Sequence, residues 1–84
     1  MRLSQRVKII KTKEDFVEFL GLLVNDFENN RDEWENESVD SYLAGMQSWI
    51  EDSEGYYENS NIPLPDNIDW NFFANVLYAA KIYE

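Results

Sequence analysis

Carboxylates and aromatic side chains are the residues of this chain that could do chemistry, since the sequence contains no histidine and no cysteine. Zinc and di-iron sites use those two residue types, so we exclude them. A Ser–His or Cys–His nucleophile is excluded for the same reason. The three glycines stand apart at positions 21, 45 and 55, so no glycine-rich phosphate loop is formed. We therefore expect no catalytic residue, no metal and no cofactor.

Carboxylates are dense in the stretch IEDSEGYYENSNIPLPDNIDW, residues 50–70. This is not an EF-hand loop, because placing Gly55 at the invariant glycine puts Ile50 at the first calcium ligand. One row of polar residues shares a helix face instead: Asp40, Gln47, Glu51, Glu54 and Glu58. We interpret the row as a solvated face, with weak adventitious Ca²⁺ or Mg²⁺ binding as the alternative. Paired-carboxylate catalysis stays formally open, but it needs a cleft that short helices rarely provide.

The charge is uneven along the 84 residues and sums to −10. Five of the seven basic residues lie in the first thirteen positions, whereas all seventeen acids follow from Glu14 onward. Such an acidic body repels phosphate backbones and anionic lipid, so we expect neither direct nucleic-acid binding nor membrane binding. The aromatic content of 15% supports a folded domain despite the charge. With no signal-peptide core and no spanning apolar run, we expect a cytoplasmic protein.

The elements that must position these residues are three helices. The first covers about residues 13–29, with Thr12 as its N-cap and Asp15 completing an approximate capping box. Its apolar residues fall on one broad stripe: Phe16, Val17, Phe19, Leu20, Leu23, Val24 and Phe27.

The second helix covers about residues 39–58 and is capped by Ser38. Tyr56 and Tyr57 continue its apolar seam, so we place both tyrosines in its last turn and Gly55 inside the helix. The alternative is that Gly55 ends the helix, which would leave a long connection of about fourteen residues.

Pro63 and Pro65 forbid a helix and predict an extended connection before the third helix, about residues 70–83. That helix is apolar on two sides. One stripe contains Trp70, Phe73, Ala74, Leu77 and Ala80, and the opposite stripe contains Phe72, Val76, Ala79 and Tyr83. We expect the helix to lie between the other two, with Trp70, Phe73 and Leu77 making the innermost contacts. Val76 and Tyr83 should then be less completely buried and form a patch.

Aromatic side chains carry most of the interaction pattern. Trp34 lies in an otherwise charged connection, where it either folds back over the start of the second helix, which we favour, or anchors a partner. Tyr56 and Tyr57 could line a groove with wet hydroxyl groups. The candidate partner-contact residues are therefore Trp34, Tyr56, Tyr57, Val76 and Tyr83.

Several pieces of the chain resemble a family of small, acidic, uncharacterised bacterial proteins, a domain of unknown function. The matching pieces are TKEDFVEFL, EWENES leading into YLAGMQSWIED, GYY, and the closing DW, FFA and LYAAKIYE. The resemblance implies a helical domain of bacterial origin and supplies no activity. It covers about residues 12–84, so we divide the chain into a basic segment, 1–11, whose order is open, and a helical domain, 12–84.

The combined interpretation is a single all-α domain that acts as a non-enzymatic, acidic protein-binding module of the adaptor or toxin-neutralising type. Its partner would be another protein with a basic surface, and the chain itself a monomer or weak homodimer. A nucleic-acid mimic that inhibits a DNA-binding protein is the alternative, and a small carboxylate-dependent hydrolase is a third. Salt dependence separates mimicry from an apolar-anchored binder.

Overall fold

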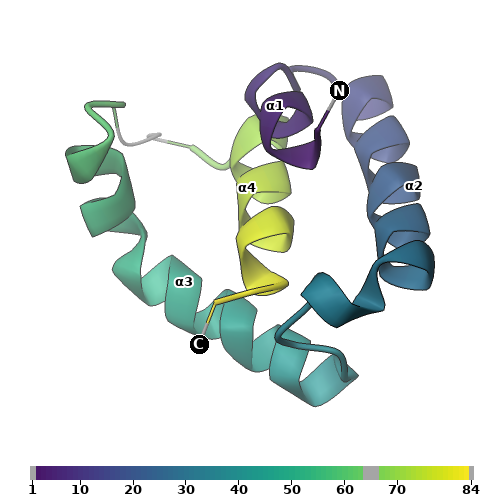
Figure 1. Cartoon of the computed structure of the whole chain (residues 1–84). Coiled ribbons are helices and arrows are strands. Elements are labelled where there is room, and N and C mark those ends of the chain that lie inside the picture. Colours follow the sequence, from purple (N-terminus) through teal and green to yellow (C-terminus); the bar gives the residue numbers. More distant parts are fainter. Residues whose placement is uncertain (1, 64–66, 84) are drawn as a thin grey trace.

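The fold is all-α in the computed structural model, which describes residues 2–63 and 67–83. The elements in chain order are α1 (Leu3–Lys8), α2 (Lys13–Asn29), the short 3-10 helix η1 (Arg31–Glu33), α3 (Val39–Asn59) and α4 (Trp70–Ala80). Figure 1 shows α4 between α2 and α3, with α1 against the upper part of α4. The predicted central position of the last helix is therefore confirmed.

The predicted start of α2 is confirmed in detail. The Thr12 hydroxyl accepts from the backbone N–H of Asp15 at 3.1 Å, and the Asp15 carboxylate accepts from the backbone N–H of Thr12 at 3.2 Å. This reciprocal pair satisfies donors that the first helical turn leaves free. Because local side chains supply these bonds, the helix boundary could be read from sequence.

The last turn of α3 contains both Tyr56 and Tyr57, as predicted, with Gly55 inside the helix. The Ser38 hydroxyl accepts from the backbone N–H of Ser41 at 3.3 Å and caps the start of the helix. α3 ends at Asn59, one residue beyond the expected bound. The stretch around the glycine is therefore helix, and the connection to α4 begins only after it.

The N-terminal segment differs from the expectation that set residues 1–11 apart from the helical domain. Leu3–Lys8 forms α1, and Val7 and Ile10 are buried with residues of α2 and α4. The Asn71 side chain on α4 donates to the carbonyl of Val7 at 2.7 Å, and Arg6 pairs with Glu18 on α2. A six-residue helix is not stable alone, so packing rather than local propensity orders it.

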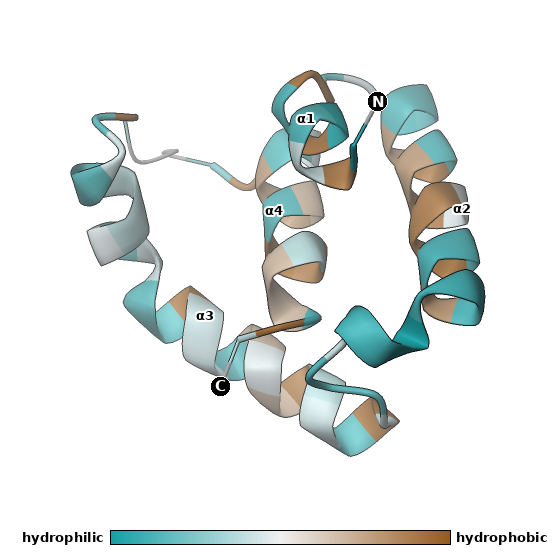
Figure 2. Ribbon diagram, viewed as in Figure 1, coloured by the Kyte–Doolittle hydropathy of each residue, from teal (hydrophilic) through white to brown (hydrophobic). Residues whose placement is uncertain are grey.

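The core lies on two sides of α4. One cluster joins α1, α2 and α4 around Phe19 and Ala74, and the other joins α3 and α4 around Trp49, Tyr57 and Val76. In Figure 2 the lower part of α4 is apolar, whereas η1 and the end of α2 are hydrophilic. The two apolar stripes of α4 thus serve two separate clusters.

The expected order of burial on α4 is wrong. Trp70 is 39% exposed and Phe73 is 46% exposed, whereas Val76 is only 3% exposed. Ala74 and Ala80 make the innermost contacts of their stripe, because only small side chains fit where helices approach closely. Val76 is buried because it packs with Trp49 and Tyr57 of α3, which cover the stripe of α4 that was expected to stay partly open.

The connection before α4 is described only in part. Asn61 has a positive φ of 56°, in the left-handed region that asparagine tolerates. The predicted extended run includes Leu64 and Pro65, which lie outside the described residues. α4 begins at Trp70, where the Asp69 carboxylate accepts from the backbone N–H of Phe72 at 2.7 Å. It ends at Ala80, three residues before the predicted bound, and continues as a turn.

Candidate functional site

A groove crosses α4 between α1 and α3 and encloses about 280 Å³. Residues of all three helices and of the turn after α4 line it: Ser4, Val7, Lys8, Trp49, Tyr56, Asn75, Tyr78, Ala79, Ile82 and Tyr83. We call it the tyrosine groove. Most of this lining is apolar, and its volume is at the low end for a cofactor site but suits one or two side chains of a partner.

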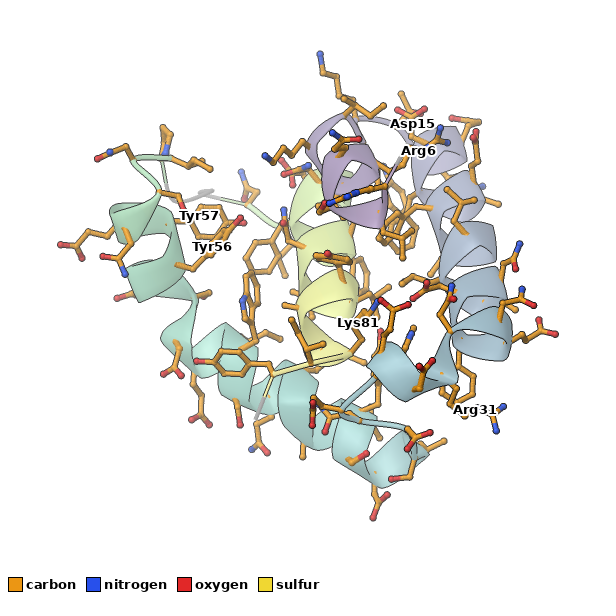
Figure 3. The ribbon with its side chains drawn as sticks, viewed as in Figure 1. Arg6, Asp15, Arg31, Tyr56, Tyr57 and Lys81 are labelled. Atoms are coloured by element: carbon orange, nitrogen blue, oxygen red, sulfur yellow. The ribbon has the colours of Figure 1, made fainter. Side chains whose placement is uncertain are left out.

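The tyrosine groove is built on aromatic contacts from α3. Tyr56 lies against Trp49, with ring centroids 5.4 Å apart, and meets Tyr57 edge-on at 5.1 Å. Figure 3 shows Tyr56 and Tyr57 projecting from α3 toward α4. Because aromatic pairs of this geometry are held by their own packing, the groove wall is preformed.

Tyr57 lies behind the groove in the core between α3 and α4, whereas Tyr83 lies at the wet edge of the groove. Tyr57 is buried against Phe72, with ring centroids 6.2 Å apart. Its hydroxyl is buried and has no hydrogen-bond partner among the described residues. Burial raises the pKa of Tyr57, and nearby Tyr56 and Asp69 raise it further. At the edge, the Tyr83 hydroxyl donates a hydrogen bond to the Asp52 carboxylate, and this bond raises the pKa of Tyr83. Both hydroxyls are therefore neutral hydrogen-bonding groups near pH 7.

Of the five candidate partner contacts, Tyr56 and Tyr83 line the groove, whereas Trp34, Tyr57 and Val76 are buried in this conformation. Buried side chains offer no surface to a partner unless the fold opens. The groove also contains Lys8 and Ile82, which the sequence analysis did not single out. No helix was predicted over α1, so the wall that Lys8 belongs to could not be foreseen.

Trp34 folds back onto the protein, as the favoured interpretation predicted. Its ring lies edge-on to Phe27 at 5.0 Å and stacks on Tyr42 at 5.8 Å. Its indole N–H donates to the Asp26 carboxylate at 2.8 Å. The ring thus covers the start of α3 and leaves no exposed anchor.

Asp26 is the centre of a polar cluster that the sequence analysis missed. Lys81 donates to the same Asp26 oxygen as Trp34, at 2.8 Å, and its ammonium lies 5.2 Å from the Trp34 ring. Figure 3 shows Lys81 reaching from the end of α4 toward α2. A broad, open hollow of about 760 Å³ adjoins this cluster, but the two charges already neutralise each other. We interpret the pair as structural.

The carboxyl groups with shifted pKa values all shift downward. Hydrogen bonds lower the pKa of Asp15, chiefly from the backbone of Lys11, and that of Asp40, chiefly from Ser38. Burial alone would raise the pKa of Asp26, but hydrogen bonds from Lys81, Trp34 and Asn30 outweigh it. A general acid needs the opposite shift, toward neutral pH. These three groups therefore act as charged acceptors that fix helix ends and the Asp26 cluster.

In residues 2–63 and 67–83 no group of three or more carboxylates lies close enough to hold a metal ion. No helix in the same ranges has the length and apolar character needed to cross a membrane.

Residues 12–84 match a family described as a family of unknown function, DUF7660. The chain belongs to DUF7660. Comparisons with curated proteins and with solved structures found no match. The DUF7660 match begins at the N-cap of α2, so the α3 and α4 walls of the tyrosine groove lie within it and the α1 wall lies outside.

Proposed function

We propose that this chain is a cytoplasmic, non-enzymatic module that binds another protein through the tyrosine groove. One observation carries the proposal: an apolar groove with exposed Tyr56 and Ile82 lies open on an otherwise acidic body. Apolar side chains gain free energy when a partner removes them from water, and tyrosine tolerates both the wet and the buried state. The groove would receive one or two apolar side chains of the partner.

On its α3 side the groove is bordered by acidic residues, which favour a partner with basic residues there, whereas Lys8 on the α1 wall carries the opposite charge. Asp52 lies at the Tyr83 edge, and Glu51, Glu54 and Glu58 are exposed farther along the same helix. Opposite charges would steer encounter and set orientation, while the apolar contact supplies most of the affinity. Binding should therefore weaken only modestly as salt rises.

The same exposed row on α3 favours one second candidate, a nucleic-acid mimic. Glu51, Glu54 and Glu58 recur at one-turn spacing and could stand for phosphates toward a DNA-binding protein. A mimic would bind through charge alone, so its binding should fall steeply with salt and be competed by duplex DNA. Groove substitutions would then have little effect.

The test places a photo-crosslinking amino acid at Ile82 in the full chain, expressed in its native host. Ile62 provides a matched control, because it is an exposed isoleucine outside the groove, 47% exposed against 52% for Ile82. We expect one dominant crosslinked protein from position 82 and none from position 62. Identical crosslinks from both positions, or none from either, would overturn the proposal.

A second arm uses the purified partner found in this way. Ile82→Ser should weaken its binding about tenfold or more, because the substitution removes an apolar wall of the groove. Ile62→Ser should leave binding unchanged, and thermal melting should show both variants folded. Equal affinity for wild type and Ile82→Ser, together with competition by DNA, would favour the mimic instead.

A further inference from the structure

The outer side of α2 carries apolar residues that no other element covers. Val17 is 57% exposed, Leu20 is 37% exposed and Val24 is 59% exposed, and their spacing places them on one stripe. Figure 1 shows α2 at the edge of the fold, with its inner side toward α4. Lys13 and Glu28 are exposed at the two ends of this stripe, which we call the outer ridge.

Gly21 lies on the outer ridge, and nothing among residues 2–63 and 67–83 requires a glycine there. Its φ is not positive, and a Cβ placed on it would meet no atom within 4 Å. A glycine inside a helix lowers stability relative to alanine, so the fold gains nothing from it. Its remaining physical use is to let another chain approach the helix backbone closely.

We propose that the outer ridge pairs with the outer ridge of a second copy, in an antiparallel arrangement. With the two-fold axis between Leu20 and Gly21, each Leu20 faces the Gly21 notch of the other copy. Val17 then faces Val24 of the other copy, and Lys13 faces Glu28 of the other copy. The surface is thus complementary to itself in both shape and charge, as a two-fold interface requires.

The charges of Lys13 and Glu28 favour this alignment of the two α2 helices over the next one along the stripe. Sliding the helices by three residues along the stripe would place Lys13 beyond the end of α2 of the other copy, so both Lys13–Glu28 pairs would be lost. Each dimer has two Lys13–Glu28 pairs by symmetry. Because each chain carries a net charge of −10, the bodies repel each other and association is weak.

The interface is separate from the tyrosine groove, which lies between α1 and α3. The inference is therefore independent of the proposed function. A dimer formed through α2 would leave both grooves open and would present two of them to a partner.

The test is sedimentation equilibrium of the full chain at one physiological ionic strength, up to millimolar concentration. Wild type should show a reversible monomer–dimer equilibrium. Lys13→Glu and Glu28→Lys should each weaken dimerisation about tenfold, since each puts like charges face to face at two places. The double variant K13E/E28K should restore wild-type association, because it exchanges the charges and keeps the pairs. Lys11→Glu changes the net charge as much as Lys13→Glu but lies off the ridge, so it should retain the wild-type constant.

The variant Gly21→Ala distinguishes an effect on dimerisation from an effect on the stability of the monomer. It should raise the melting temperature of the monomer while weakening dimerisation, because a methyl group fills the notch that receives Leu20. A strictly monomeric wild type would overturn the proposal. So would a double charge exchange that fails to restore association, or a Gly21→Ala variant that dimerises more tightly.

Discussion

The side-chain amide of Asn36 donates to the carbonyl of Ala80 at 2.8 Å, across 44 positions of the chain. It donates to the carbonyl of Tyr83 at 2.7 Å as well, and its backbone N–H donates to the carbonyl of Lys81 at 3.1 Å. Carbonyls at a helix C-terminus have no partner within the helix. Asn36 therefore caps α4 from the loop before α3 and joins that loop to the C-terminal end of α4.

Replacing Asn36 with alanine should destabilise the fold. The amide is buried, so its removal leaves the carbonyls of Ala80 and Tyr83 without this donor, at a cost of about 1–3 kcal/mol. Urea unfolding followed by circular dichroism measures the change. Asn59→Ala, at the exposed end of α3, should change stability by less than about 0.5 kcal/mol. Equal effects at the two positions would show that the Asn36 cap contributes nothing.

Two glycines of α3 should respond to alanine in opposite directions. A Cβ on Gly45 would lie 2.8 Å from the carbonyl oxygen of Ala80 and 2.8 Å from the Asn36 amide, so Gly45→Ala should cost about 1–3 kcal/mol. A Cβ on Gly55 would meet no atom of the described residues within 4 Å. Gly55→Ala should therefore stabilise the domain by up to about 1 kcal/mol, through helix propensity.

Thermal melting of the two variants side by side tests this pair. Because both glycines lie in one helix and receive the same methyl group, helix propensity acts equally on both. A Gly45→Ala variant that melts higher than wild type would mean that α3 and α4 are not as close at this point as the structure has them.

The parts of the fold that could be predicted are those that local side chains determine. Thr12 and Asp15 fix the start of α2 within four residues of sequence, and the seam through Tyr56 and Tyr57 fixes the length of α3. The role of Asn36 could not be foreseen, because its partners lie 44 and 47 positions away, at the C-terminal end of the chain. Burial along α4 could not be predicted for a similar reason: Val76 packs with Trp49 and Tyr57 of α3, and the sequence does not show which stripe of α4 faces α3.

In the candidate site, too, local sequence predicts some residues, whereas others depend on contacts between distant parts of the chain. The sequence singles out Tyr56 as a possible groove residue and Tyr83 as part of the less buried stripe of the last helix, and both line the groove. The opposite wall, with Lys8, depends on where α1 docks. Trp34 is shielded from solvent by an aromatic cluster and by Asp26, and no spacing pattern in the sequence predicts either contact.

The same substitution at two valines, one buried and one exposed, should test the burial of Val76 on α4. Val76 is 3% exposed on α4 and Val24 is 59% exposed on α2. Val76→Thr keeps the side-chain shape but buries a hydroxyl group, which costs about 1–3 kcal/mol if it finds no partner. Val24→Thr should stay within about 0.5 kcal/mol of wild type, because its hydroxyl reaches water. Chemical denaturation decides the order, and a Val76 variant as stable as the Val24 variant would restore the expectation that Val76 is incompletely buried.

The Asp26 cluster predicts a pH-dependent stability difference. Lys81 and Trp34 each donate to the Asp26 carboxylate at 2.8 Å, and these bonds keep its pKa below the usual value despite burial. Asp26→Asn removes the charge but keeps the size, so it should cost about 1–3 kcal/mol at pH 7. As the pH falls, this carboxyl takes up its proton in the unfolded chain before it does so in the folded chain, at about pH 3.9. Stability from the charged carboxylate is therefore fully present above that pH and is lost as pH falls through the lower pKa of the folded state.

The difference in melting temperature between wild type and Asp26→Asn should consequently shrink as the pH falls below about 4. Asp32→Asn is the matched control, since it removes the same charge from the exposed η1 helix. It should give a small difference that changes little over the same range. Melting curves at several pH values from neutral to acid measure both. A difference for Asp26→Asn that stays constant down to the lowest pH would mean that the carboxylate charge does not stabilise the cluster, and that its geometry alone holds Trp34 and Lys81 in place.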